Sequence, residues 1–139
     1  MPKVSPRDNA WLFSRLDSIW LKYFPKMKQS NPIEIKFGRY SKFRLGSIKL
    51  NRKSNHSLIT ITAMFKSEGV PLEVVDHTIA HELVHYAHGF SSKKTRLHKY
   101  PHSGGIVKKE MYKRGMGYLN NAYGAWVKDY RRKLIADAR

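Results

Sequence analysis

Cysteine is absent from this chain of 139 residues. Its absence excludes disulfide bonds, thiolate-bound zinc and iron–sulfur clusters. Any transition metal must therefore be held by histidine, aspartate or glutamate. The absence is also compatible with a reducing compartment.

Long apolar runs are absent as well. No run approaches the roughly 20 apolar residues that span a bilayer, and the first residues lack an apolar core of signal-peptide length. We therefore expect a soluble protein of the cytoplasm, associated with the nucleoid or, in a eukaryote, located in the nucleus. No membrane partner is expected.

Acidic residues are few: 10 Asp and Glu stand against 27 Lys and Arg, which gives a net charge of +17. This excess favours a polyanionic partner, because basic side chains bind phosphates by releasing condensed counterions. A surface bias without a partner is one alternative. Binding to a membrane surface is another, and it requires a basic amphipathic helix that only the C-terminal segment could supply.

Apolar periodicity predicts a single α+β domain over residues 1–139. Helical spacing indicates helices over 7–23, 71–88, 103–115 and 118–138, and a basic loop is expected over 90–101. Alternating or β-rich stretches indicate strands over 33–37, 43–50 and 57–65. We expect a small, mostly antiparallel sheet packed on the N-terminal helix and on the helix over 71–88.

The stretch "VVDHTIAHELVHYAHG" (74–89) places histidines and acids in an otherwise apolar helix. His81 and His85 lie one turn apart on one face, so both imidazoles can reach one cation. Glu82 is displaced by about 100° around the axis, where its carboxylate can approach a water beside the ion without being a ligand. This is the H-E-x-x-H pattern of zinc-dependent proteolysis. The alternative is a pair of surface histidines with a solvated glutamate.

A catalytic zinc needs a third protein ligand and an open position. His77 and His88 lie on nearly the same stripe, but His77 and His85 are separated by about 12 Å of helix rise, so one ion cannot easily bind both. We interpret His77 and His88 as supporting, surface or phosphate-facing residues. Three downstream candidates remain open, and the small residues that follow the first favour it: His102, Glu110 and His98.

The order of these parts resembles that of the SprT-like metallopeptidases, the group that includes the Spartan DNA–protein crosslink proteases. The resemblance runs from about residue 8 to about residue 118. It is carried by an amphipathic helix, the strands "RLGSIKLN" (44–51) and "LITIT", the histidine-rich helix, and "HSGGIV" (102–107). It implies a minimal zincin-like metalloprotease core with Zn²⁺ held by His81, His85 and His102, and Glu82 as general base.

Two features depart from that family. Ser103 follows the third histidine where the family often has glycine, and the chain has no cysteine for the C-terminal zinc ribbon that many members carry. The resemblance implies a zinc endopeptidase that cuts proteins associated with or crosslinked to DNA. We expect the substrate to bind as an added strand at a sheet edge over residues 57–63. Candidates for the oxyanion partner are Tyr100, Tyr112 and His98.

Basic residues cluster within 26–44, 91–102 and 108–133, and aromatic residues are interleaved with them. Exposed aromatic side chains in a basic groove stack unpaired bases. We therefore expect single-stranded or distorted DNA to bind without sequence specificity; the alternative is that these aromatics belong to the core. The predicted stacking residues are Tyr40, Phe43, Tyr100, Tyr112 and Tyr118. The predicted nucleic-acid contacts are Lys93, Lys94, Arg96, Lys99, Lys108, Lys109 and Arg114.

Three hypotheses follow from the sequence. The first is a zinc protease that acts on DNA-bound proteins. The second is a zinc peptidase with other substrates, in which the charge serves RNA binding. The third is a non-catalytic, basic nucleic-acid-binding domain with a zincin-like fold.

Overall fold

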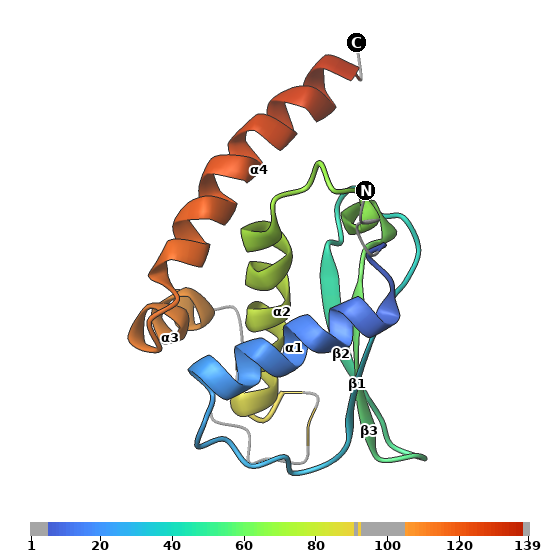
Figure 1. Ribbon diagram of the computed structural model, residues 1–139, viewed down its shortest axis with the longest axis vertical. Helices are drawn as coiled ribbons and strands as arrows, with labels where there is room; N and C mark the ends of the chain where they lie inside the picture. The colour runs from blue at the N-terminus through green and yellow to red at the C-terminus, as the bar shows by residue number, and fades with distance from the viewer. Residues whose placement is uncertain (1–5, 91, 93–104, 138–139) are drawn as a thin grey trace, which may run out of the picture.

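The computed structural model describes residues 6–90, 92 and 105–137. The expected α+β class is confirmed, and the elements follow one another along the chain as α1 (Asn9–Tyr23), β1 (Ile33–Phe37), β2 (Gly46–Asn51), β3 (His56–Ile61), the 3-10 helix η1 (Ala63–Lys66), α2 (Leu72–Ala87), α3 (Ile106–Lys113) and α4 (Gly117–Asp137). Helix α2 lies between the sheet on one side and α3 and α4 on the other, while α1 crosses in front of them (Figure 1).

The sheet is mixed, so the prediction of a mostly antiparallel sheet is wrong. The strand order is β1-β3-β2, with β1 and β3 parallel and β2 and β3 antiparallel. The last strand in sequence takes the central position and is the most buried of the three, with Ile59 and Ile61 fully buried. Strand β3 ends at Ile61 and not at residue 65, because the Thr62 side chain accepts a hydrogen bond from the backbone of Met64 and begins η1.

Helix α1 begins where Asp8 caps it, accepting a hydrogen bond of 2.8 Å from the backbone N–H of Trp11. A side-chain cap of this kind satisfies one of the free N–H groups at a helix start. The helical spacing seen in the sequence buries one face, formed by Leu12, Leu16 and Ile19. That face packs on β1 and on α2.

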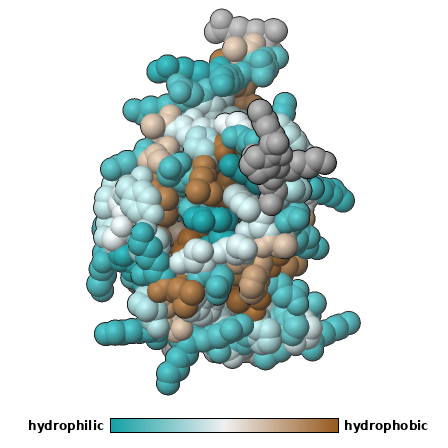
Figure 2. Space-filling model, in the orientation of Figure 1, coloured by the Kyte–Doolittle hydropathy of each residue, from teal (hydrophilic) through white to brown (hydrophobic). Residues whose placement is uncertain are grey.

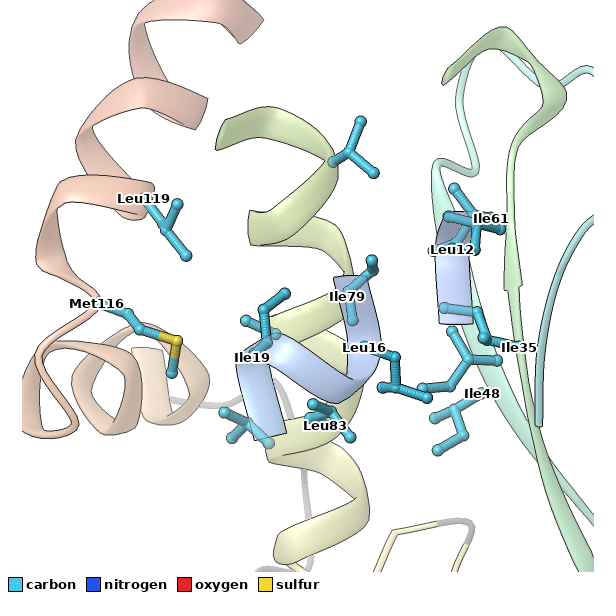
Figure 3. Packing of buried hydrophobic residues seen from close by; sticks show 14 of the residues in the cluster. Leu12, Leu16, Ile19, Ile35, Ile48, Ile61, Ile79, Leu83, Met116 and Leu119 are labelled. Carbon is cyan, nitrogen blue, oxygen red and sulfur yellow. The ribbon is translucent and has the colours of Figure 1, made fainter. Parts of the chain in front are cut away.

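Helix α2 is the centre of the core. Its apolar side chains meet α1 and the sheet on one side and α3 and α4 on the other, and all of the following are fully buried: Val74, Val75, Ile79, Ala80, Leu83 and Val84. Figure 3 shows Ile79 and Leu83 of α2 next to Leu16 and Ile19 of α1, with Met116 and Leu119 on the side away from the sheet. A helix enclosed in this way holds the histidines on its surface in fixed positions.

Helices α3 and α4 confirm the two C-terminal helices expected from the sequence. Gly115, with φ of 89°, makes the turn between them. The first part of α4 packs on the body through Leu119, and Trp126 meets Phe65 edge-on with ring centroids 5.9 Å apart. The outer part of α4 extends beyond the body (Figure 1), and its surface is mostly hydrophilic, whereas apolar side chains gather over the middle of the face in Figure 2.

No helix in the described part of the chain combines the length and the apolar character that crossing a membrane requires.

Candidate metal centre

Helix α2 brings His81 and His85 together as the sequence predicted. Their Nε2 atoms are 3.1 Å apart, and the rings meet edge to face with centroids 4.8 Å apart. One potential ligand atom from each of His81, Glu82 and His85 lies within 4.8 Å of the other two. The two imidazoles therefore point at a shared position beside the helix.

The distance between these nitrogens is that of a hydrogen bond between the two rings, and the same spacing is compatible with a shared zinc ion. Two nitrogens at 2.0–2.1 Å from a tetrahedral ion are separated by about 3.3 Å, which is close to the observed 3.1 Å. His85 is buried and His81 is half-buried, and both rings line the same cleft. The donor set, two imidazoles with a carboxylate nearby, suits zinc and needs no thiolate.

Glu82 is buried beside this pair, with only 5% of its surface exposed. Its Oε2 atom makes no hydrogen bond within the described residues. Burial raises the pKa of Glu82 to about 7, and the positive charge of Arg44 offsets part of that increase. A carboxylate with a pKa near the working pH is suited to accept and return a proton.

The end of α2 fixes the ring of His85. Gly89, with φ of 80°, ends the helix in a left-handed turn in which the N–H of Phe90 donates to the carbonyl of His85 at 2.9 Å. This is the hydrogen-bond pattern of a Schellman cap, which favours glycine at this position. The turn folds Phe90 back against His85, with ring centroids 5.5 Å apart.

A cleft of about 430 Å³ opens over the two histidines and Glu82, between α2 and the start of β2. Gly46 of β2 allows the close approach: a Cβ atom at this position would lie 2.6 Å from Cγ2 of Thr78. Phe43, Arg44, Phe90 and Tyr123 also line the cleft.

The prediction that residues 57–63 form the sheet edge that binds substrate is wrong. Residues 57–61 belong to β3, which is paired on both sides and offers no edge. In the described part of the chain β2 pairs only with β3, so its other side is an edge, and Gly46, Ser47 and Ile48 line the cleft. The prediction failed because alternation along a strand does not reveal which strand is central.

His77 is buried, which excludes the surface and phosphate-facing positions and leaves the supporting role among the three that were expected. It stacks on Tyr123 of α4, with ring centroids 4.1 Å apart and planes 5° from parallel. Burial lowers the pKa of His77 to about 4, against a hydrogen bond with Asn120 that raises it. His77 is therefore neutral at pH 7 and forms, together with Tyr123, a wall of the cleft. Helical spacing predicted the helix that carries Tyr123, but not the contact of Tyr123 with His77.

Glu110, one of the three candidates for the third ligand, lies outside the cluster of His81, Glu82 and His85. Its carboxylate contacts Nε2 of His88 at 3.4 Å and the guanidinium of Arg114 at 2.9 Å. Burial alone would raise the pKa of Glu110, but Arg114 and His88 together lower it. These contacts favour a structural role for Glu110 and His88. His102 and His98 lie outside the described residues, so the third ligand stays a prediction.

The predicted nucleic-acid contacts fall into three groups. Lys93, Lys94, Arg96 and Lys99 lie outside the described residues. Lys108 and Lys109 are exposed on α3. Arg114, by contrast, contacts Glu110, donates to the carbonyl of Tyr23 at 3.1 Å and lies over the ring of Phe24, so its guanidinium serves the fold.

The predicted aromatic residues also differ among themselves. Tyr40 and Phe43 are exposed. Tyr112 and Tyr118 are half-exposed, with their hydroxyls bonded to Asn121 and Tyr23. Tyr100 lies outside the described residues.

A comparison of the chain with protein-family models, with curated proteins and with solved structures found no match.

Proposed function

We propose that this protein is a zinc-dependent endopeptidase with a zincin-like core of the SprT-like type. One observation carries the proposal: His81 and His85 turn their Nε2 atoms to within 3.1 Å of each other, beside a buried glutamate. A pair of surface histidines with a solvated glutamate does not require this convergence. The sequence motif, the distance and the burial of Glu82 all support the same chemistry.

Four residues of the chain would have roles in peptide hydrolysis. His81 and His85, with His102 as the proposed third ligand, would hold Zn²⁺, which when bound polarises the scissile carbonyl and lowers the pKa of a nearby water. Glu82 accepts a proton from the attacking water while the new C–O bond forms. It then returns the proton to the amide nitrogen as the C–N bond breaks.

The edge of β2 supplies the binding surface for the substrate. An extended peptide added to this edge makes main-chain hydrogen bonds, and these position its scissile bond with little dependence on side chains. Because β2 borders the cleft through Gly46, Ser47 and Ile48, a strand laid along it passes the two histidines. Such a mode of binding suits a peptidase that accepts many different proteins.

The net charge of the chain supports a proposal about its substrates. A net charge of +17 attracts nucleic acid. We propose that the substrates are proteins associated with or crosslinked to DNA, and that the enzyme works in the cytoplasm, at the nucleoid or in the nucleus. The resemblance to the Spartan group supports the crosslink role.

The test is metal analysis together with a casein cleavage assay, with and without single-stranded DNA. Glu82→Gln should retain zinc and lose cleavage, because it keeps the size of the side chain but cannot accept the proton. Glu73→Gln is the matched control, since it removes an exposed carboxylate from the first turn of the same helix. Full activity in Glu82→Gln would refute the mechanism.

The same experiment separates the alternatives. Absence of both metal and cleavage would favour a non-catalytic nucleic-acid-binding domain. Cleavage that is indifferent to DNA would favour a peptidase with other substrates.

A further inference from the structure

The segment Arg39–Arg44, "RYSKFR", connects the end of β1 to the strand beside the cleft. We call it the aromatic-basic loop. It contains three cations and two aromatic residues, and all five are exposed. Phe43 is 86% exposed and Tyr40 is 62% exposed. A single exposed aromatic residue needs no explanation. Two aromatic residues that alternate with cations within six residues form a surface that is both positively charged and aromatic.

The backbone of the aromatic-basic loop is held firmly. Thr62 binds Ser41 twice: its hydroxyl accepts from the Ser41 N–H and donates to the Ser41 carbonyl, both at 2.9 Å. The Tyr130 hydroxyl donates to the carbonyl of Lys42 at 2.6 Å, and the N–H of Ala63 donates to the carbonyl of Arg39 at 3.2 Å. The loop therefore presents its exposed rings from a fixed scaffold, which reduces the entropy lost when a ligand binds.

Its positive charge is uncompensated. Within the described residues no carboxylate forms an ion pair with Arg39, Lys42 or Arg44. The sequence contains no Asp or Glu from residue 35 to residue 67. Cations without acidic partners attract phosphates, and aromatic faces next to them accept unpaired bases.

The aromatic-basic loop is continuous with the candidate metal centre. Phe43 and Arg44 line the same cleft as His81, Glu82 and His85. A strand of nucleic acid on the loop would thus lie at the mouth of the cleft, where a protein attached to it could enter.

We propose that the aromatic-basic loop is a docking surface for single-stranded DNA, in which Phe43 and Tyr40 stack on unpaired bases while Lys42 and Arg44 contact phosphates. The proposal rests on the proposed function for its choice of DNA. It selects Tyr40 and Phe43 from the predicted stacking residues and replaces the cationic contacts expected on α3 and over residues 93–99, because it places the strand on the sheet side of the cleft. Paired bases expose only their edges along a duplex, so the surface favours single strands.

The test is fluorescence anisotropy with the zinc-loaded full chain and a labelled oligothymidine of about 16 nucleotides, within the range of site sizes known for single-strand binding domains. Phe43→Ala and Tyr40→Ala should each weaken binding by about 5-fold to 100-fold, the range typical for loss of one stacked base. Arg44→Gln should also lower the salt slope of the binding constant by about 0.7, as expected for one lost phosphate contact on a single strand.

Two control variants match these changes. Phe13→Ala removes another exposed ring, 57% exposed, from a groove on α1 that contains Asp17 and no cation. Arg52→Gln removes one exposed positive charge from the turn at the far end of β2. Both should bind the oligothymidine within about twofold of the unsubstituted chain, because neither touches the aromatic-basic loop.

Binding of the Tyr40→Ala/Phe43→Ala double variant within twofold of the unsubstituted chain would overturn the proposal. So would a loss of binding to phosphatidylserine vesicles with DNA affinity unchanged, because the loop would then be a membrane contact. Casein cleavage by the unsubstituted chain is measured separately. If casein is not cut but the loop variants lose DNA binding, the proposed function fails and the docking surface stands. If casein is cut but the loop variants bind DNA as the unsubstituted chain does, the docking surface fails and the proposed function stands.

Discussion

Glu82→Gln should stabilise the metal-free protein at alkaline pH while it removes the proposed activity. Glu82 is buried next to the two histidines, and burial raises its pKa from 4.5 to about 7. An ionised carboxylate at this position is therefore less favourable in the folded chain than in the unfolded chain. Glutamine has nearly the same size and cannot ionise, so it avoids this cost.

The sign and size of the effect follow from proton linkage. Between pH 4.5 and pH 7 the folded chain keeps a proton on Glu82 that the unfolded chain has released, so its stability falls as the pH rises. An increase in pKa from 4.5 to about 7 corresponds to about 3 kcal/mol at 1.36 kcal/mol per pKa unit. The advantage of Glu82→Gln should therefore be close to zero at pH 4 and reach about 3 kcal/mol at pH 8.

The assay is urea unfolding of both chains in a chelator, from pH 4 to pH 8. The chelator is needed because a bound cation would stabilise the carboxylate. His77 titrates in the opposite sense: its lowered pKa of about 4 contributes stability that is lost as the pH falls below 6.5. That contribution is present in both chains and cancels in the difference. A difference that stays flat across this pH range would refute the reasoning.

Three further perturbations test the packing and the metal. Gly46→Ala should destabilise the fold by about 1–3 kcal/mol, because the added methyl would lie 2.6 Å from Cγ2 of Thr78; urea unfolding should show recovery in Gly46→Ala/Thr78→Ser, and an equal loss in both variants would contradict the contact. Asp76→Asn removes the negative charge and one of the two oxygens that accept from Arg15 at 2.7 and 3.0 Å and join α2 to α1, and should cost about 1–3 kcal/mol in the same measurement. A loss below about 0.5 kcal/mol would show that the charge of the pair contributes nothing. Zinc at about a hundredfold excess over its Kd should raise the thermal midpoint by about 5–10 °C, and an equal rise in His85→Ala would place the ion elsewhere.

Local patterns predicted the helices and the paired histidines well. The spacing of apolar residues placed α1 and α2 within two residues of their observed ends, and the four-residue interval between His81 and His85 was enough to predict that their rings converge. Both inferences depend on the geometry of a single helix, which the sequence determines nearly alone. Gly89, which has a left-handed backbone and follows the end of α2, is likewise a local feature, because it marks the end of the helix.

The strand order could not be predicted in the same way. Strands β1, β2 and β3 all show some alternation of burial, and a period of two is the same for a central strand and for an edge strand. What differs is the burial that each strand gains from neighbours distant in the sequence. Placing the substrate edge on residues 57–63 failed for this reason, because β3 is the last strand in sequence and the central strand in space.

The cleft itself is a product of these long-range contacts. Its walls come from three places in the chain: the start of β2 at Gly46, the α2 residues around His81, and Tyr123 of α4, which stacks on His77. In the proposed enzyme the motif in α2 would supply the ligands, and a peptide would reach them only if β2 lies close to the helix with its edge open. That approach depends on the missing side chain of Gly46. Variation at the walls should therefore alter substrate binding before it alters metal affinity, because the two histidines are fixed by their own helix.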